Sequence, residues 1–351
     1  MVSFAELDLF PTNIGLSAIS MKNQLVVEAA VSEDKAEVLA LLQESFAAVQ
    51  RSSSVQRGMD FWDWKYRTGP FGVAIVQIIR IEGRIAASGV LWPMSLTWNH
   101  RILRALQLCD TAVHSEFRRR GLFGLLNEAR KDLAAQQQYD LIFNFPNANS
   151  LPGYVKSGWQ YAGRVPWLVR VAKPMAVVRD RLNPGKSKAI EVPTEYNLCE
   201  SIASDIPAHL AGAQHCISLD RPAGYWRWRF SEHPNRQYGL VHSSTDPNSI
   251  AVFTLSRKPS GLIEMVIVDL VCEPESLSGL LGAILKCARR VGAGFIALMK
   301  PRGLPIGAFY RRAFAPVREK NLAVLPLAAD LPDKIADIEH WNFRAAMHDS
   351  I

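Results

Sequence analysis

The sequence predicts two tandem α/β domains, each built on a mixed β-sheet. Three observations carry this prediction. The chain has 351 residues, which at roughly 100 to 200 residues per domain indicates two domains. A tryptophan-rich motif occurs once in each half, and strand and helix patterns alternate within each half, as they do in α/β and α+β proteins.

The composition is that of a folded protein. Apolar residues make up 48% of the chain and charged residues 21%, which is enough for substantial cores. No stretch has the roughly 18 apolar residues of a membrane helix, and the opening residues lack a basic region before an apolar run. We therefore expect a cytoplasmic protein without a membrane span.

The net charge and the cysteine spacing indicate which kinds of partner and which cross-links to expect. A net charge of +7 favours an anionic partner, such as a nucleotide cofactor, a nucleotide-linked substrate or a nucleic acid, without choosing among them. The five cysteines are far apart and form no CxxC pair, so we expect neither disulfides nor structural zinc. They are Cys109, Cys199, Cys216, Cys272 and Cys287.

The motif FWDWKYRTGP at residues 61–70 recurs as YWRWRFSEHP at 225–234, an offset of 164 (225 minus 61). A second echo, LPGYVKSGW and LPIGAFYRRAF, follows in the same order and sets Tyr154 against Tyr310. Large aromatic residues at close spacing usually anchor a core. The alternative is that they form a wall of a substrate cleft.

The repeat sets the expected domain limits. Residues 25–172 form the first domain and 195–330 the second, joined by a linker at 173–194 that is rich in proline and charge. An extension at 1–24 precedes them and a tail at 331–351 follows. Two aromatic residues near the end of the tail, Trp341 and Phe343, predict that it docks on the protein.

Periodicity places the elements of the first half. Strands are expected at 26–30, 72–81, 84–94, 102–113, 140–145 and 160–171. Helices are expected at 32–50, with Ser32 as its cap, at 122–137 and at 150–157. Glu82 and Gly83 are typical of a hairpin turn between the second and third strands.

The turn HSEFRRRGLFG at residues 114–124 joins a predicted strand to a predicted helix. A glycine at the start of a helix lets backbone N–H groups approach a ligand, and these donors hold phosphate together with the helix dipole. Arg118, Arg119 and Arg120 add positive charge. The alternative is a solvated basic face.

The run from Arg118 to Phe123 resembles the acyl-CoA pyrophosphate loop of the GCN5-related N-acetyltransferase (GNAT) superfamily, Gln/Arg-x-x-Gly-x-Gly/Ala. Phe123 departs from the last position of that pattern, and Gly124 follows it. Residues 147–159, NANSLPGYVKSGW, are similar to the Asn-x2-Ala-x3-Tyr-x3-Gly-Phe segment of the same superfamily, with two substitutions. The resemblance covers 25–172 directly and reaches the second half only through the repeat.

This resemblance implies an acetyl-CoA-dependent enzyme without a metal. The backbone of Ala112 and Val113 would pair with the pantetheine arm like an added strand. Tyr154 would be the general acid toward the departing sulfur, or else a core tyrosine. Asn147 would bond the cofactor arm or stabilise its own loop. The residues implied to hold the pyrophosphate are Arg118, Arg119, Arg120, Gly121, Leu122, Phe123 and Gly124.

Asp110 is the leading candidate for a general base. It lies in an apolar strand, where a carboxylate is costly unless it is solvated or paired. The alternative is a structural carboxylate. Asp269 occupies the comparable strand of the second half, which favours the structural role. His114 could relay a proton, although its position before the loop is more typical of a surface residue.

The second half keeps the strand and helix pattern without the phosphate signature. Residues 263–273 and 277–291 are joined with neither an arginine run nor a glycine. We expect a degenerate GNAT-like domain that shapes the acceptor site, with Arg227, Arg229 and Arg236 as candidates to line the cleft.

Three functions compete. The leading one is transfer of an acetyl group from acetyl-CoA to a small-molecule amine, with an amino sugar or nucleotide-linked amino sugar suggested by analogy. The second is an aminoacyl transferase of the peptidyltransferase type, which would hold tRNA. The third is a non-catalytic acyl-CoA-binding module. No basic tract is interleaved with aromatic residues, so we expect no nucleic acid partner.

Overall fold

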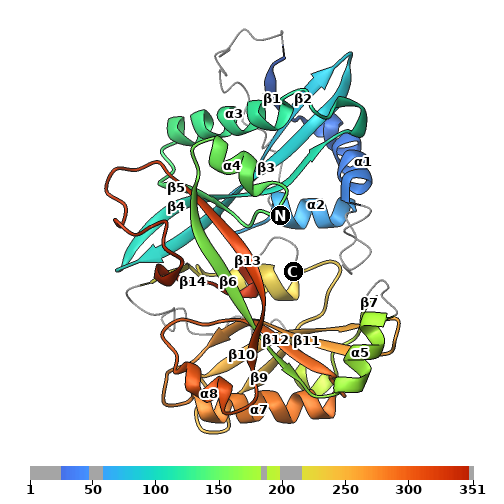
Figure 1. Cartoon of the computed structure of the whole chain (residues 1–351), viewed down its shortest axis with the longest axis vertical. Helices are drawn as coiled ribbons and strands as arrows, with labels where there is room; N and C mark the ends of the chain where they lie inside the picture. The colour runs from blue at the N-terminus through green and yellow to red at the C-terminus, as the bar shows by residue number, and fades with distance from the viewer. Residues whose placement is uncertain (1–24, 47–57, 183–187, 198–215, 348–351) are drawn as a thin grey trace, which may run out of the picture.

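The computed structural model describes residues 25–46, 58–182, 188–197 and 216–347 (Figure 1). The first half contains β1 (Val27–Ala29), α1 (Lys35–Phe46), α2 (Met59–Tyr66), β2 (Ile75–Ile81), β3 (Arg84–Trp98), β4 (Arg101–Val113), α3 (Leu122–Gln136), β5 (Leu141–Asn144), α4 (Leu151–Lys156) and β6 (Gln160–Val171). The second contains β8 (Ile217–Leu219), β9 (Gly239–His242), β10 (Ile250–Arg257), β11 (Ile263–Val271), α7 (Leu277–Arg290), β12 (Phe295–Met299), α8 (Ile306–Tyr310) and β13 (Ala315–Pro326). The connection carries α5 (Pro174–Leu182) and β7 (Lys188–Ala189), and the tail carries β14 (Trp341–Asn342).

The mixed-sheet tandem architecture is confirmed. The order β3-β4-α3-β5-α4-β6 is repeated as β10-β11-α7-β12-α8-β13. In each half an antiparallel strand pair is followed by one parallel pair, β4 with β5 and β11 with β12. All these strands belong to one sheet with the path β1-β2-β3-β4-β5-β13-β6-β12-β11-β10-β7.

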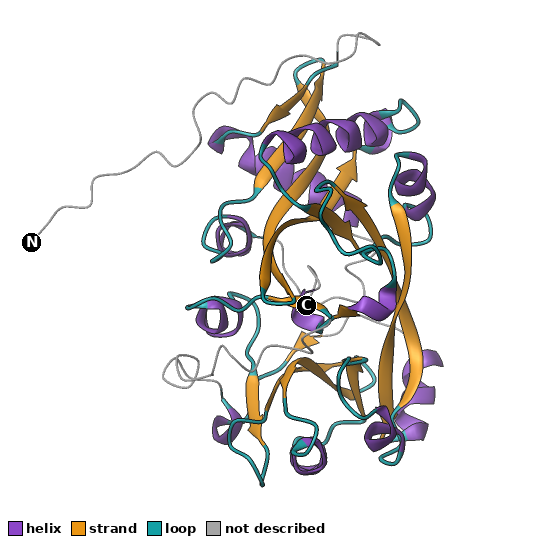
Figure 2. Ribbon diagram, turned by 90° about the vertical axis from the view of Figure 1, so that its left-hand side faces the viewer, coloured by secondary structure: helices purple, strands orange, loops and turns teal. Residues whose placement is uncertain are grey.

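The two halves exchange their last long strands. β13 from the second half pairs with β5, and β6 from the first half pairs with β12. β6 and β13 also pair with each other and run together between the two halves (Figures 1 and 2). Each half therefore completes the sheet of the other, and separating them requires breaking backbone hydrogen bonds.

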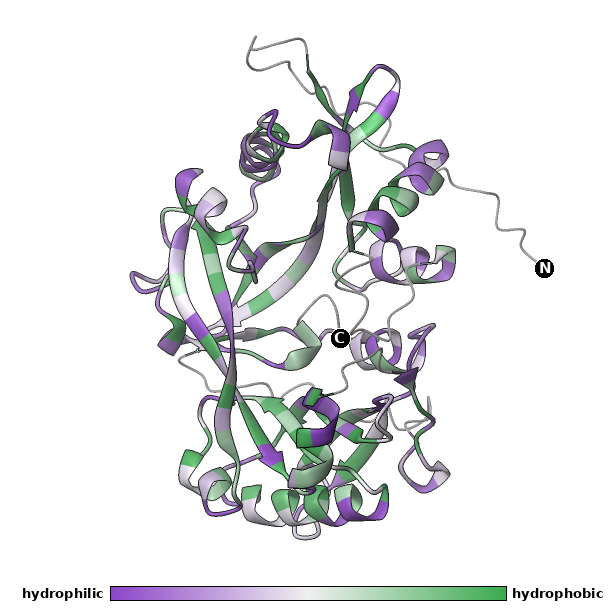
Figure 3. Cartoon of the chain, turned by 45° about the vertical axis from the view of Figure 1, so that its right-hand side comes forward, coloured by the Kyte–Doolittle hydropathy of each residue, from purple (hydrophilic) through white to green (hydrophobic). Residues whose placement is uncertain are grey.

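Helices cover both faces of the first-half sheet. α1 packs on β3 and β4 and α3 packs on β2 and β3, so the strands between them are buried on both sides. Leu122, Leu126 and Leu133 give α3 its inward apolar stripe. The strands are largely apolar in Figure 3, as this double burial requires.

The two tryptophan motifs meet across a local two-fold relation. Trp64 Nε1 donates to the carbonyl oxygen of Trp228 at 2.7 Å, and Trp228 Nε1 donates to the carbonyl oxygen of Trp64 at 2.9 Å. Their rings stack with centroids 5.3 Å apart. Both side chains are buried. The motif is thus a core anchor that joins the halves.

Some local expectations were wrong. Ser32 does not cap the first helix. The Asp34 carboxylate accepts the Val31 N–H at 3.0 Å, and a short 3-10 turn precedes α1. The expected helix end at 47–50 lies outside the described residues. The connector at 173–194 is more ordered than its composition predicts, because it forms α5, and β7 pairs with β10.

The β2–β3 hairpin is confirmed, although both strands shift. Glu82 and Gly83 have φ of +53° and +77°, the left-handed values that a tight hairpin turn needs. β2 begins at Ile75 rather than 72, because Gly72 has φ +112° and continues the preceding turn. β3 continues past Met94 to Trp98, where it pairs with the start of β4.

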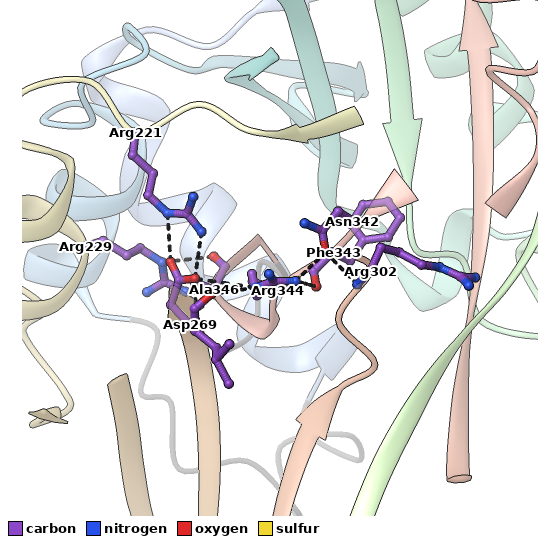
Figure 4. Close-up of polar contacts among 9 residues, drawn as sticks. Arg221, Arg229, Asp269, Arg302, Asn342, Phe343, Arg344 and Ala346 are labelled. Atoms are coloured by element: carbon purple, nitrogen blue, oxygen red, sulfur yellow. Dashed lines mark hydrogen bonds and ion pairs between the residues drawn. The ribbon is translucent and has the colours of Figure 1, made fainter. Parts of the chain in front are cut away.

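The tail docks as predicted. Trp341 and Phe343 are 2% and 1% exposed and their rings stack at 5.0 Å. Arg229 Nε donates to the carbonyl oxygen of Ala346 at 3.1 Å, and Arg344 Nε donates to that of Leu270 at 3.1 Å (Figure 4). Arg229 therefore holds the tail and is buried, whereas the acceptor-cleft hypothesis needs it exposed.

In the part of the chain that the structure describes, no helix is long and apolar enough to cross a membrane. Within the described residues, Cys109, Cys216, Cys272 and Cys287 form no disulfide. Cys199 lies outside the described residues.

The tryptophan pair predicts a large stability effect. Trp64→Ala removes a buried ring and leaves the Trp228 carbonyl without its donor, so the free energy of unfolding should fall by about 3–5 kcal/mol. Chemical denaturation measures this change. Trp98→Ala, at a partly buried tryptophan, is the matched control and should cost less. Equal losses in the two variants would contradict the anchoring role.

Candidate functional site

β4 and β5 separate part-way along their length. Their parallel pairing covers Ala105 to Gln107 on β4 and goes no further in the described residues. The other edge of β4 continues to pair with β3 as far as Val113. The β5-facing edge of residues 108–113 therefore has no strand partner in that part of the chain, and at its end the Val113 carbonyl accepts a hydrogen bond from Arg118 Nε at 3.4 Å.

A pocket of about 450 Å³ lies beside this edge. It brings together residues from the end of α1, the end of β4 and the turn before α3. They are Ser45, Phe46, Thr111, Ala112, Val113, Phe117, Arg118, Arg119, Gly121, Leu122 and Phe123. Its volume is in the range of small-molecule and cofactor sites.

The predicted phosphate turn immediately precedes the N-terminus of α3. Gly121 caps this helix with φ +79°, a left-handed value that suits glycine and opens the helix amides toward the pocket. Arg118 and Arg119 line the pocket and are exposed. Arg120 does not line it, because its guanidinium lies over the Phe117 ring at 5.2 Å. Gly124, in the first turn of α3, also stands outside the lining.

Asp110 sits at a β-bulge of β4. The β3–β4 register shifts between Ser88 and Val90, and Asp110 has φ +47°. Its Oδ2 accepts a hydrogen bond from Lys65 Nζ at 2.5 Å and another from the Tyr66 hydroxyl. The carboxylate is buried in this ion pair. The geometry therefore favours the structural alternative over a free general base.

The second half repeats the arrangement with different partners. Asp269 lies next to a register shift of the β10–β11 pair. Its carboxylate accepts hydrogen bonds from Arg221 Nη2 at 2.7 Å and from Nε at 3.1 Å (Figure 4). A buried ion pair at the bulge is thus common to both halves, with or without a cofactor turn.

Tyr154 does not itself line the pocket, but it contacts Phe123, which does. It is 2% exposed and its ring packs edge-on against Phe123 at 5.1 Å. Burial raises the pKa of its phenol, while the Arg130 charge and hydrogen bonding with Thr111 and Asn144 lower that pKa. Thr111 lines the pocket, so the phenol lies directly behind the pocket wall.

Tyr154 and Tyr310, which the sequence repeat aligns, have different environments in the structure. Tyr310 is 48% exposed, and the adjacent Phe309 is fully buried in its place. The second half therefore carries no buried phenol at the end of α8.

Asn147 and His114 stabilise loops. Asn147 Oδ1 accepts the backbone N–H groups of Asn149 and Ser150, both at 2.9 Å. His114 Nδ1 accepts the N–H of Glu116 at 3.3 Å and begins a short 3-10 turn. Neither side chain lines the pocket.

Sequence reasoning missed several residues of the site. Ser45 and Phe46 come from α1 and carry no motif. Thr111 is adjacent to Asp110, yet only the bulge aims it at the pocket. Arg130 had a visible signal, because it falls on the apolar stripe of α3 four residues after Leu126.

Residues 27–162 match the model of the family described as "Acetyltransferase (GNAT) domain". These residues are therefore similar to a GNAT acetyltransferase domain. The match includes the open edge of β4, the turn before α3 and Tyr154, so the splayed strands and the glycine turn belong to an acyltransferase fold. None of the curated proteins matches the sequence.

Solved structures extend the GNAT likeness over both halves. A GCN5-related N-acetyltransferase from Anabaena variabilis has a TM-score of 0.60 at 14% identity, covering 87% of this chain and 73% of that one. Eis1 from Mycobacterium abscessus has 0.55 at 13%, covering 86% and 74%. N-myristoyltransferase from Saccharomyces cerevisiae, solved with myristoyl-CoA, has 0.58 at 9%, covering 88% and 84%. At these identities the likeness shows the tandem fold.

The ion pair at the bulge predicts a stability defect. Asp110→Asn keeps a side chain that tolerates the positive φ and leaves the Lys65 ammonium buried without its counter-charge. The free energy of unfolding should fall by about 3–5 kcal/mol, as measured by denaturation. The double variant Lys65→Met/Asp110→Asn should recover much of this loss. A stable but inactive Asp110→Asn protein would restore Asp110 as a candidate base.

Proposed function

We propose that this protein is an acyl-CoA-dependent N-acyltransferase that moves an acetyl group from acetyl-CoA to the amine of a small molecule. The observation that carries the proposal is the continuous path from the open edge of β4 to the left-handed Gly121 at the start of α3, with Tyr154 behind its inner wall. An amino sugar or nucleotide-linked amino sugar is our first choice of acceptor.

The residues of this path fit the parts of acyl-CoA. The free edge of β4 at Ala112 and Val113 offers hydrogen bonds to an extended amide-bearing arm, as an added strand would use them. The amides at the start of α3 and the charges of Arg118 and Arg119 suit a diphosphate. In the solved N-myristoyltransferase the same fold is bound to an acyl-CoA, which supports this class of donor.

Tyr154 supplies the proton in the proposed reaction. When the amine nitrogen attacks the thioester carbon, the carbon–sulfur bond breaks and the thiolate requires a proton. The phenol is close to the pocket through Thr111 and is kept protonated at neutral pH by burial, which raises its pKa.

The alternatives fit the site less well. A purely regulatory acyl-CoA module has no need of a buried phenol beside the pocket. An aminoacyl transferase that holds tRNA has no need of a diphosphate-binding turn. The positive charge of Arg118 and Arg119 is at that turn, where a nucleotide cofactor uses it.

The cofactor turn is tested by Gly121→Glu. A glutamate side chain brings negative charge and strain to the left-handed position, so micromolar binding of acetyl-CoA measured by calorimetry should be lost. Gly83→Glu is the matched control, because Gly83 has nearly the same φ, +77°, at an open hairpin turn. Binding that survives Gly121→Glu, or no binding by the wild type, would contradict the proposal.

The acid is tested by Tyr154→Phe. This change removes only the hydroxyl, so kcat should fall by about 10²- to 10⁴-fold while KM for acetyl-CoA changes little. Steady-state assays with a panel of small amines measure both constants. Tyr310→Phe, at the exposed tyrosine of the second half, is the control. An unchanged kcat for Tyr154→Phe would remove the phenol from the mechanism.

A further inference from the structure

We propose that Arg130 is a positioning residue that supplies the counter-charge for the tyrosinate form of Tyr154. This inference deepens the proposed function and rests on it for the catalytic step. The electrostatic coupling between Arg130 and Tyr154 does not depend on the proposed function, and it can be tested in the protein without substrates.

Arg130 is a buried cation without an anion. Its side chain is 0% exposed on the sheet-facing side of α3. Nη1 donates to Asn127 Oδ1 at 3.2 Å, Nη2 donates to Thr111 Oγ1 at 3.1 Å, and Nε has no hydrogen-bond partner. No carboxylate pairs with it among the described residues. Burying an unpaired charge is costly, so its position needs an explanation.

The sheet is shaped to admit this guanidinium. A Cβ atom on Gly89 of β3 would lie 1.4 Å from Arg130 Nη2 and 3.1 Å from Thr111 Oγ1. Any side chain at position 89 would therefore collide with the arginine. Gly89 also lies where the β3–β4 register shifts. The guanidinium of Arg130 therefore packs against the sheet at the same bulge that contains Asp110 and Thr111.

The positive charge of Arg130 would stabilise the ionised forms of two neighbouring groups. Arg130 acts on the phenol of Tyr154 and on the thiol of Cys109, and its field lowers the pKa of Tyr154 against the effect of burial. Thr111 joins the two sites, because its hydroxyl accepts from Arg130 and also bonds Tyr154. With its acceptor lone pair engaged by the cation, that hydroxyl is free to donate to a phenolate.

This arrangement matches the charge that the reaction creates. As the amine nitrogen bonds to the thioester carbon and the carbon–sulfur bond breaks, the proton passes from the Tyr154 oxygen to the departing sulfur. A phenolate then forms in a buried site. The proton lost by the nitrogen reaches solvent, and the phenolate takes one back. Arg130 stabilises the anion in the interval, when burial alone would disfavour it.

The second half provides an internal comparison. The buried residues of α7 are Leu277, Leu280, Leu281, Ile284, Cys287 and Ala288, none of them charged. The buried aromatic residue of α8 is Phe309, which has no hydroxyl. In the half without the phosphate turn, α7 thus has no buried arginine and α8 no buried phenol, as expected if the two act together at this place in the fold. Buried arginines and tyrosines of that half, such as Arg229 and Tyr238, lie outside these two helices.

The electrostatic coupling between Arg130 and Tyr154 is tested by titrating Tyr154. In protein labelled with 3-fluorotyrosine, the ¹⁹F signal of Tyr154 is the one of 8 tyrosine signals that disappears in Tyr154→Phe. Arg130→Met should raise the Tyr154 pKa by about one unit or more, because it removes the charge and keeps an unbranched side chain in the buried position. Arg130→Lys should restore a lower value. An unchanged pKa in Arg130→Met would overturn the pairing.

Thr111→Val provides a second route if Arg130→Met fails to fold. It removes the hydroxyl that links the two groups and leaves the arginine in place. The same ¹⁹F titration should show a higher Tyr154 pKa than in the wild type. A pKa equal to that of the wild type in this variant would overturn the proposal.

Kinetics separate the electrostatic role from a structural one. Arg130→Met should lower kcat about ten-fold or more, with KM for acetyl-CoA nearly unchanged, and Arg130→Lys should recover part of the loss. In the Tyr154→Phe background, Arg130→Met should have no further effect. An equal loss in both backgrounds would show that Arg130 acts without Tyr154. Absence of turnover in the wild type would count against the proposed function and leave the titration to decide the pairing.

Discussion

The reciprocal bond between Trp64 and Trp228 is the contact on which the two-domain arrangement depends. Each indole N–H donates to the backbone carbonyl of the other residue, so neither half can satisfy these groups alone. The exchange of β6 and β13 supports the same arrangement from the sheet, because each strand completes the other half. The site is therefore built on one continuous structure rather than on a free domain.

Within this structure, the halves have diverged at one place. Both keep a register shift and a buried aspartate on the strand before the main helix, Asp110 in one and Asp269 in the other. Among the described residues, only the first half places a left-handed glycine at the start of its main helix, exposed arginines before that helix, a buried arginine within it and a buried phenol on the short helix that follows. The shared ion pair stabilises both halves, and the proposed donor site rests on the groups found in the first half.

The sequence predicted the fold well where the signal is local. Periodicity and turn residues placed β6 and the start of α3, and the repeated tryptophans revealed the tandem halves. The strand exchange was not predictable, because β6 has the same apolar pattern whichever strand pairs with it. Asp110 was ambiguous, since only the fold brings Lys65 to it. Arg130 escaped attention because a single arginine in a helix is usually exposed, and Gly89, which makes room for it, is distant in sequence.

The central claim is that the first half alone binds acyl-CoA, along the open edge of β4 and the start of α3. Hydrogen–deuterium exchange with and without acetyl-CoA tests it most directly, since an occupied edge protects its backbone amides. We expect protection at residues 108–113 and 119–125, and none at the corresponding 267–271 and 275–280 in the second half. Protection confined to the second half, or absent from both, would contradict this account.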